Sequence, residues 1–268
     1  SFIANIARKR PELNRDKTIG TAGTTNTGAV DDLKAIAAIC RKHGIWFHVD
    51  GCIGALLRIA PEHKSLVDGM ELADSIALDP HKWLHTPFEA GCVLLRDAQR
   101  HFETFEMHGD YLQMQTRGLI AGKFLADYGF ELSRGFKALK IWMSLKENGV
   151  AKFGRLIDQN IAQAQYLEAQ IKAQPALELV APVDLNIVCF RYANGITDET
   201  VLKDLNTEIM LRIQESGLAV PSDTTVAGKH CLRVAINNHR TTRQDLDMLV
   251  AGVLDCGKTL ESEAGVQA

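Results

Sequence analysis

A lysine stands directly after what reads as a buried strand, where an ammonium group is unusual. The apolar run 75–78 stops at Asp79-Pro80, because proline cannot continue a β-ladder and biases its predecessor toward extended geometry. Lys82 follows, between a histidine and a tryptophan. Burial makes a lysine amine less basic and therefore a nucleophile suited to Schiff-base chemistry. The ordinary alternative is a loop lysine that extends its charge into solvent.

Other chemically useful side chains follow neighbouring predicted strands. Thr25 lies in a Gly/Thr/Asn loop after a short strand, and Asp50 ends the compact strand 45–50, which also carries His48. Ligands of open α/β sheets bind outside the carboxyl ends of the strands, where an ionised aspartate requires a cationic partner. A protonated pyridine nitrogen is such a partner, and pyridoxal phosphate combines it with an aldehyde that bonds to lysine. Together with Lys82, these strand ends therefore predict a pyridoxal phosphate site.

The elements that position these residues alternate between strand and helix. Asp31 or Asp32 is expected to cap a helix that Gly44 ends. Further strands are expected at 75–78 and 90–96. This order predicts an α/β layer with a mainly parallel sheet. The apolar face of the capped helix is expected to comprise Leu33, Ile36, Ala37, Ile39 and Cys40.

The second half of the chain reads differently. Two consecutive helices, from Leu132 to Gly149 and from Val150 toward Gln174, have no strand between them, and Phe136, Leu139 and Trp142 are expected to be core residues of the first. A small α+β domain follows, with expected strands at 177–181, 186–192 and 231–237 and helices at 198–216 and 242–260. We therefore predict two domains: residues 1–150 as part of a larger domain that is incomplete at its N-terminus, and residues 151–268 as a linking helix and a small C-terminal domain.

Composition excludes several classes of protein. The chain has 268 residues, 46% of them hydrophobic, which is enough to bury one large core or two modest ones. A net charge of -3 without a basic stripe gives no support for nucleic acid as a partner, and no apolar run is long enough to cross a bilayer. The six scattered cysteines suit reduced thiols better than a disulfide framework or structural zinc. We expect a cytoplasmic protein that binds neither nucleic acid nor membrane.

Several segments, in this order, resemble the group II pyridoxal-phosphate-dependent amino acid decarboxylases. That family of fold-type-I enzymes includes glutamate and aromatic amino acid decarboxylases. The matching segments are residues 21–31 (TAGTTNTGAVD), 46–50 (WFHVD), 73–75 (ADS), 80–84 (PHKWL), 132–142 (LSRGFKALKIW) and 232–237 (LRVAIN). The resemblance covers nearly the whole chain after about Thr18. It also implies that this is a partial chain, without the N-terminal part that carries the phosphate cradle and the ring-stacking histidine.

The resemblance implies a role for each matched residue. Lys82 corresponds to the Schiff-base lysine, and Asp50 to the carboxylate that pairs with the pyridine nitrogen. Thr25 and His48 correspond to positions that line the cofactor side of the pocket, with His48 counted among the catalytic residues. His81 corresponds to a residue that contacts the phosphate.

Three further assignments extend the site. Cys52 falls where the family usually has a small alanine under the ring, and Arg233 corresponds to an arginine that faces the substrate carboxylate. Asp79 is placed at the cofactor, where many members have asparagine. A carboxylate there repels a phosphate unless it points away.

A long irregular stretch, roughly Tyr111 to Gly129, corresponds to the mobile catalytic loop of the family. Many members place a tyrosine there that protonates the substrate carbon after carbon dioxide leaves. This chain has Leu125 at that position, with Tyr128 three residues on. In the family, losing the tyrosine is associated with a shift toward aldehyde products.

The resemblance implies a carboxy-lyase that converts an L-amino acid to its amine and carbon dioxide with pyridoxal 5'-phosphate. It also implies a homodimer with active sites at the subunit interface. Trp83-Leu84 after the lysine is more typical of the aromatic-type enzymes. The alternatives are an aldehyde synthase or other lyase on the same fold, and a cofactor-free binding or regulatory relative. His81 and His85 lie at i, i+4 near Asp50, but this spacing is common by chance and we expect no metal.

Overall fold

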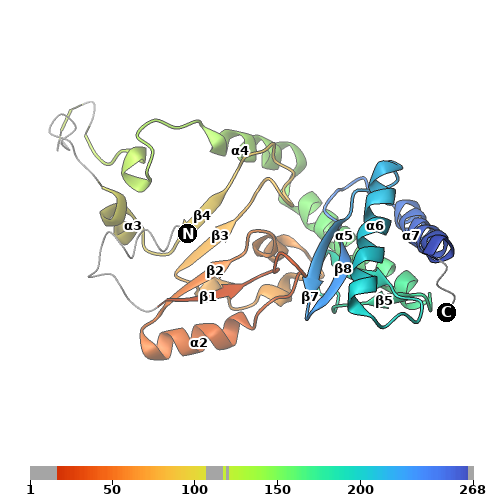
Figure 1. Cartoon of the computed structure of the whole chain (residues 1–268). Coiled ribbons are helices and arrows are strands. Elements are labelled where there is room, and N and C mark those ends of the chain that lie inside the picture. Colours follow the sequence, from red (N-terminus) through yellow and green to blue (C-terminus); the bar gives the residue numbers. More distant parts are fainter. Residues whose placement is uncertain (1–16, 107–116, 119–120, 265–268) are drawn as a thin grey trace. The chain divides into compact units, whose positions relative to one another are not determined.

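A computed structural model describes residues 17–106, 117–118 and 121–264. It divides into two compact units, and each is described separately (Figure 1). Over the described residues, the first unit comprises 17–20, 32–55 and 68–147, and the second comprises 21–31, 56–67 and 148–264. Both units draw on more than one segment, so the division at residue 150 stays a prediction. Within these ranges no helix combines the length and apolarity that a membrane crossing needs.

The first unit is organised around a four-stranded sheet. Its strands are β1 (Lys17–Thr21), β2 (Trp46–Asp50), β3 (Ser75–Leu78) and β4 (Cys92–Leu95), hydrogen-bonded in that order (Figure 1). β2 and β3 are parallel, whereas β4 returns antiparallel to β3. The connection between β3 and β4 contains no helix, and a parallel pairing would require a crossover of that kind. The predicted α/β layer is confirmed, with one antiparallel strand at its edge.

Helix α2 (Leu33–His43) covers one face of this sheet. Asp32 is its N-cap and accepts a hydrogen bond from the Ala35 amide at 2.9 Å, and Gly44 ends it in the left-handed conformation. The expected apolar face is correct except at Ile39, whose side chain is 57% exposed. Each residue turns the helix by about 100°, so Ile39 points away from the side that carries the buried residues Leu33, Ala37 and Cys40.

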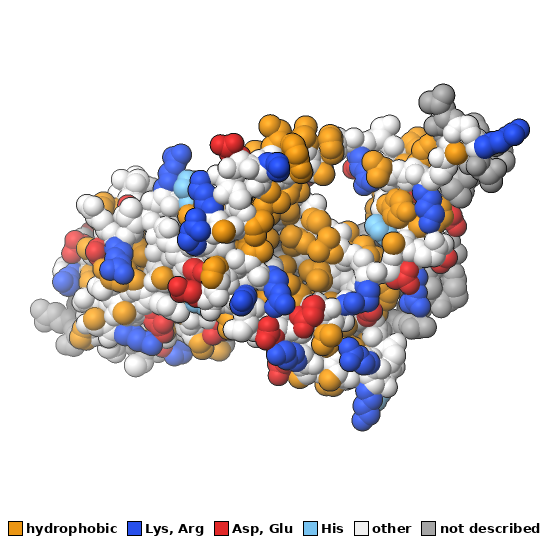
Figure 2. Space-filling view, turned by 180° about the vertical axis from the view of Figure 1, so that it is seen from behind, with side chains coloured by type: hydrophobic (Ala, Val, Ile, Leu, Met, Phe, Trp, Pro, Cys, Tyr) orange, Lys and Arg blue, Asp and Glu red, His pale blue; other side chains and the backbone are white. Residues whose placement is uncertain are grey.

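Helix α4 (Lys137–Asn148) corrects one expectation. Phe136, Leu139 and Trp142, predicted to be core residues, are 74%, 41% and 59% exposed. Hydrophobic side chains gather in the upper centre of Figure 2, where α4 lies. The helix is held through its lysines, by an ion pair from Lys137 to Glu89 and a hydrogen bond from Lys140 to the Pro87 carbonyl. Helical spacing identified an apolar face, but spacing alone does not determine what covers it.

Shorter elements complete the described chain, and they occur in both units. They are the 3₁₀ helices η2 (Gly54–Ile59), η3 (Lys64–Val67), η4 (Met70–Leu72) and η5 (Leu125–Tyr128), and the helix α3 (Ala98–Phe105). The Asp97 carboxylate caps α3 by accepting hydrogen bonds from two amides of its first turn. Aspartate is a favoured residue at this position because it satisfies amides that have no partner inside the helix.

The second unit contains an antiparallel sheet with three helices. The strands, in spatial order, are β5 (Leu177–Leu179), β6 (Ile187–Tyr192), β8 (Lys229–Ala235) and β7 (Ser222–Val226), and the helices are α5 (Val150–Lys172), α6 (Glu199–Glu215) and α7 (Arg243–Ala264) (Figure 1). Residues of these helices and of β6 and β8 form one apolar core, which includes Phe190, Ile209 and Val253. The predicted α+β arrangement is confirmed. Strand β7 was not predicted, because its mostly polar and exposed sequence lacks an apolar alternation.

Asn206 joins helix α6 to the end of strand β6, and we expect its loss to destabilise the second unit. Its buried side chain accepts from the Tyr192 amide at 2.8 Å and donates to the Tyr192 carbonyl at 2.9 Å. Asn206→Ala leaves both backbone groups buried without a partner, and the free energy of unfolding should fall by about 2–4 kcal/mol. Urea denaturation measures this change. Lys203→Ala, on the exposed side of α6, should stay within about 0.5 kcal/mol of wild type, and equal stability of the two variants would contradict the assignment.

Candidate functional site

The candidate site begins at the carboxyl ends of β2 and β3. These strands are in parallel register, with Asp50 opposite Ala77. The pairing continues past both strands, since the Gly51 amide donates to the Ala77 carbonyl at 3.0 Å and the Asp79 amide donates to the Cys52 carbonyl at 3.1 Å. The segment after Asp50 and the segment that begins at Asp79 therefore run side by side, as the sequence predicted.

His48 lies on the same face of β2 as Asp50, because side chains alternate along a strand. Its ring is buried, and Nδ1 lies 2.8 Å from the hydroxyl of Ser75, the residue opposite it on β3. The Trp46 indole donates to the same hydroxyl oxygen at 2.9 Å. Since an indole N–H only donates, the Ser75 oxygen accepts from Trp46 and its own hydrogen is available to His48 Nδ1. This arrangement suits a neutral imidazole that carries its hydrogen on Nε2.

The electrostatic environment of His48 agrees with a neutral ring. Burial lowers the pKa of His48 below its ordinary value, while the negative charge of Asp50 and an interaction with the backbone of Ser75 act in the opposite direction. The desolvation of the charged form is the largest of these effects. At neutral pH the ring is therefore an uncharged hydrogen-bonding group beside a carboxylate.

Cys52 shows that the charged residues of the two strand ends lie close together. The Cys52 amide donates to Asp50 Oδ1 at 3.2 Å. Burial of the thiol, its hydrogen bond to Asp50 and the negative charges of Asp50 and Asp79 raise the pKa of Cys52 to about 12, and the positive charge of Lys82 partly opposes them. All three charged side chains thus act on one thiol, which stays protonated at neutral pH and is no nucleophile.

Lys82 is presented by a tight turn. The turn closes with the Lys82 amide donating to the Asp79 carbonyl at 2.9 Å, and Lys82 Nζ lies 3.0 Å from Asp79 Oδ2. The next two side chains, Trp83 and Leu84, are buried at 1% and 6% exposure. These apolar anchors fix the backbone after the turn, while the lysine side chain remains 36% exposed. The lysine is therefore fixed at its base and reachable at its amine.

His81 is held by the loop that leads into β4. Its Nδ1 lies 2.9 Å from the Ala90 carbonyl oxygen and 3.2 Å from the Ala90 amide, and its ring packs edge-on against Phe88 with centroids 4.9 Å apart. Nε2 lies 3.9 Å from Asp79 Oδ2. The ring is thus positioned next to the lysine turn, and its assignment to a phosphate stays a prediction.

Thr25 and Arg233 belong to the second unit, where they contact each other. The Arg233 guanidinium donates two hydrogen bonds to the Thr25 carbonyl, at 2.9 and 2.6 Å. The Cys189 thiol donates to the Asn26 carbonyl at 3.3 Å, so β6 and β8 together hold the Thr25 loop. Arg233 was predicted to face a substrate carboxylate, and here it also anchors backbone. The roles of Thr25 and Arg233 toward a ligand stay predictions.

The predicted catalytic loop is described only in part. Residues 111–116 and 119–120, including Tyr111, lie outside the described residues. Leu125 begins η5 and is 78% exposed. The Tyr128 carbonyl accepts from His101 Nε2 at 3.0 Å, and its ring packs against those of His101 and Phe102 in α3. Tyr128 therefore contributes to packing against α3.

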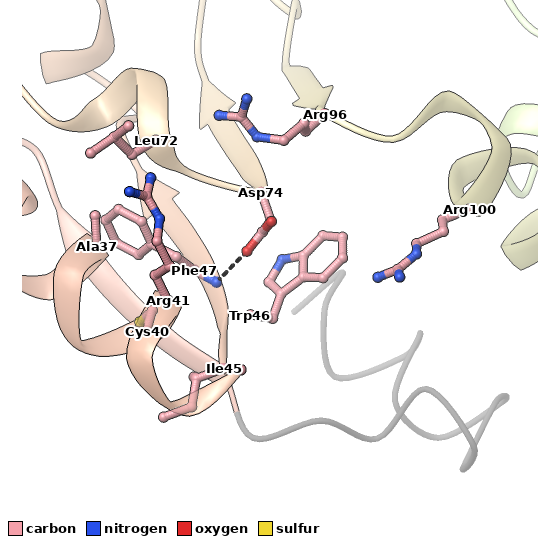
Figure 3. A pocket seen from close by; sticks show the side chains of 11 residues that line it. Ala37, Cys40, Arg41, Ile45, Trp46, Phe47, Leu72, Asp74, Arg96 and Arg100 are labelled. Carbon is pink, nitrogen blue, oxygen red and sulfur yellow. Dashed lines mark hydrogen bonds between the residues drawn. The ribbon is translucent and has the colours of Figure 1, made fainter.

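A separate hollow of about 370 Å³ opens at the amino ends of β2 and β3 (Figure 3). Two of its polar side chains bind backbone groups: the Asp74 carboxylate accepts from the Phe47 amide at 2.8 Å, and the Arg96 guanidinium donates to the Ala73 carbonyl at 3.0 and 2.9 Å. No lysine is among the described residues that line it. The chemistry therefore favours the carboxyl ends of the strands as the site.

The described residues contain one cluster with the geometry of a metal site, and it lies elsewhere. Glu62, His63 and Asp158, in the second unit, have ligand atoms within 4.8 Å of one another. Two of its three members already contact each other directly, with His63 Nδ1 2.7 Å from Asp158 Oδ1. His81 and His85 do not join Asp50 in any such cluster among the described residues.

Reasoning from the sequence missed the residues that support the site. Ser75 and Trp46 orient His48, and Ala90 orients His81 through backbone groups. A period-two reading of β2 would have placed Trp46, His48 and Asp50 on one face. The contact of His48 with Ser75 depends on the register between β2 and β3, and the contact of His81 with Ala90 depends on the path of the loop before β4. Neither contact can be recognised from a pattern in a single sequence.

The donor set fits pyridoxal phosphate. A primary amine and a carboxylate stand at adjacent strand ends, and both act electrostatically on the Cys52 thiol between them. Lysine is the residue that bonds to the aldehyde of this cofactor, and an acidic group beside the ring nitrogen completes the usual pair. Lys82 would hold the cofactor and Asp50 would face its ring nitrogen.

Comparison with known proteins places this architecture among fold-type-I pyridoxal-phosphate enzymes. Residues 17–193 match the pyridoxal-dependent decarboxylase conserved domain. The chain is 34% identical over 251 residues to an aromatic-L-amino-acid decarboxylase of Bacillus atrophaeus, covering 90% of this chain and 52% of that protein. It is 30% identical over 262 residues to phenylacetaldehyde synthase of Petunia hybrida, covering 92% and 52%. The crystal structure of Oryza sativa TDC with PLP and tryptamine has a TM-score of 0.84 at 29% identity, covering 96% of this chain and 54% of that one.

The chain belongs to the group II pyridoxal-dependent decarboxylase family. It spans about half the length of the curated relatives that it matches. The fold and the family expected from the motifs are thereby confirmed, and the activity of the whole protein is a matter for proposal.

The pKa of His48 offers a direct test of the site's electrostatics. Because the Asp50 carboxylate favours the charged imidazolium, Asp50→Asn should lower the already depressed pKa of His48 further. Histidine-resolved NMR titration measures this shift. Asp32→Asn is the matched control, since asparagine caps a helix as well as aspartate and should leave the His48 titration unchanged. An unchanged or raised pKa of His48 in Asp50→Asn would show that the two side chains do not interact.

Proposed function

We propose that this protein is a pyridoxal-phosphate-dependent decarboxylase that converts an L-amino acid to its amine and carbon dioxide. The observation that carries the proposal is the placement of Lys82 and Asp50 at neighbouring parallel strand ends, with Cys52 between them. Membership of the decarboxylase family supports it. The cofactor is pyridoxal 5'-phosphate, bound covalently through Lys82.

Each residue of the site has a definable task. When bound, pyridoxal phosphate supplies a ring that accepts the electron pair left behind as carbon dioxide departs. Asp50 holds a proton on the ring nitrogen, which keeps that ring electron-poor. His48, neutral and fixed by Ser75, lies beside Asp50 on the same face of β2. Cys52 contributes a small, uncharged surface.

We further propose that the substrate is an aromatic L-amino acid. Trp83 and Leu84 follow the lysine as in the aromatic-type enzymes of the family. The relative from Bacillus atrophaeus, 34% identical, is named as an aromatic-L-amino-acid decarboxylase. A bond is broken most readily when it stands perpendicular to the cofactor ring, so the anchor for the substrate carboxylate selects the reaction. Arg233, as a guanidinium, is the proposed anchor.

The second candidate function is an aldehyde synthase. Leu125 stands where many family members carry a tyrosine, and a leucine side chain has no proton to give to the carbon that lost carbon dioxide. The relative from Petunia hybrida is named phenylacetaldehyde synthase and is 30% identical. In that reaction the amino acid, dioxygen and water yield aldehyde, carbon dioxide, ammonia and hydrogen peroxide. The homodimer with active sites at its interface stays a prediction for either function.

Reduction of the cofactor bond tests the proposal directly. The full-length protein is incubated with pyridoxal phosphate, reduced with borohydride and mapped by peptide mass spectrometry. We expect a pyridoxyl group on Lys82, lost in Lys82→Ala together with the visible absorbance of the bound cofactor. Lys137→Ala is the control, because Lys137 forms an exposed ion pair with Glu89 and its removal should leave the label on Lys82.

The outcomes separate the three functions. A protein that carries no pyridoxyl group on Lys82 and shows no cofactor absorbance is a cofactor-free relative, and the proposal fails. With the label present, amine as the product identifies a decarboxylase. Aldehyde with hydrogen peroxide and ammonia identifies an aldehyde synthase.

A further inference from the structure

We propose that Asp79 is the counter-ion of Lys82, a positioning residue that holds the ammonium group in place while the amine is not bonded to a ligand. The inference rests on the proposed function only in taking Lys82 as the reactive amine. The family resemblance predicts that Asp79 lies at the cofactor, where its charge would repel a phosphate. The geometry gives that charge a different partner.

The carboxylate and the amine are held together by the backbone that carries them. Asp79 Oδ2 lies 3.0 Å from Lys82 Nζ, and the turn between them closes with the 2.9 Å hydrogen bond from the Lys82 amide to the Asp79 carbonyl. Pro80 occupies the second position of this turn, where its fixed φ angle suits the backbone. The Asp79 amide is in turn bonded to the Cys52 carbonyl at 3.1 Å. The ion pair is therefore built into the turn.

The surroundings direct the carboxylate toward the lysine. Asp79 is 23% exposed at its side chain and Lys82 is 36% exposed. The other groups that face the pair are the protonated Cys52 thiol, which supplies no charge, and His81, whose Nε2 lies 3.9 Å from the same Oδ2. Lysine is thus the nearest full positive charge.

Such a pair has a chemical consequence. An amine that is engaged with a carboxylate is held in one direction and is less accessible to an electrophile. The Asp79 carboxylate, 3.0 Å from Lys82 Nζ, restrains the direction of the lysine side chain. Asp79 therefore keeps Lys82 paired and oriented while it is not bonded to a ligand.

Competitive acylation of the cofactor-free protein tests the inference without any activity assay. The protein is treated with limiting acetic anhydride, and the acylation rate of each lysine is read by peptide mass spectrometry. In Asp79→Asn, Lys82 should be acylated about 1.5- to fivefold faster than in wild type, the range expected for a partly exposed ion pair. Asp79→Glu, which restores the charge, should return the rate close to that of wild type. Circular dichroism confirms that each variant is folded.

Two controls make the result specific. Lys172 and Glu168 form a 2.7 Å ion pair on the exposed side of α5, and Glu168→Gln should leave the acylation of Lys82 unchanged. Asp79→Ser provides a second uncharged variant if the asparagine variant does not fold. Equal acylation of Lys82 in wild type and in a folded uncharged variant would overturn the inference. A wild-type protein that never acquires a pyridoxyl group refutes the proposed function instead, and leaves the acylation result intact.

Discussion

The parallel pairing of β2 with β3 is the constraint on which the site depends. It places Asp50 opposite Ala77, and two further backbone hydrogen bonds extend the alignment beyond both strands. A shift of one residue would turn His48 and Asp50 to the opposite face, where Phe47 and Val49 are buried. The register of β2 against β3 therefore determines whether His48 and Asp50 lie on the face of the site or on the face that Phe47 and Val49 occupy.

The two carboxylates at the carboxyl ends of β2 and β3, Asp50 and Asp79, differ in their electrostatic partners. Among the described residues, no lysine or arginine forms an ion pair with Asp50, so this carboxylate suits a ligand that brings positive charge. Asp79 is paired within its own turn at 3.0 Å. Two carboxylates with similar surroundings thus have different uses because one is already neutralised. The Cys52 thiol, on which both carboxylates act, is protonated at neutral pH and therefore adds no further charge.

Much of this arrangement was predictable from residue type and order. The strand that ends at Asp50, the stop at Asp79-Pro80 and the Asp32 cap are local patterns with local physical causes, and each lies where it was expected. The family resemblance then linked them into one fold. What failed was the inference from apolar spacing to burial, because Trp142 lies on an apolar helix face that the described residues leave uncovered.

The partners of polar side chains were the least predictable feature, and the reason is physical. Arg233 and His81 both bind backbone carbonyls, and every residue carries one, so no sequence pattern marks the acceptor. Ser75 matters only because parallel register brings it opposite His48. The ion pair of Asp79 with Lys82 differs from these cases, since both residues belong to one turn and their spacing is visible in the sequence. Interactions within a turn can therefore be read from sequence, whereas those between strands and loops require the fold.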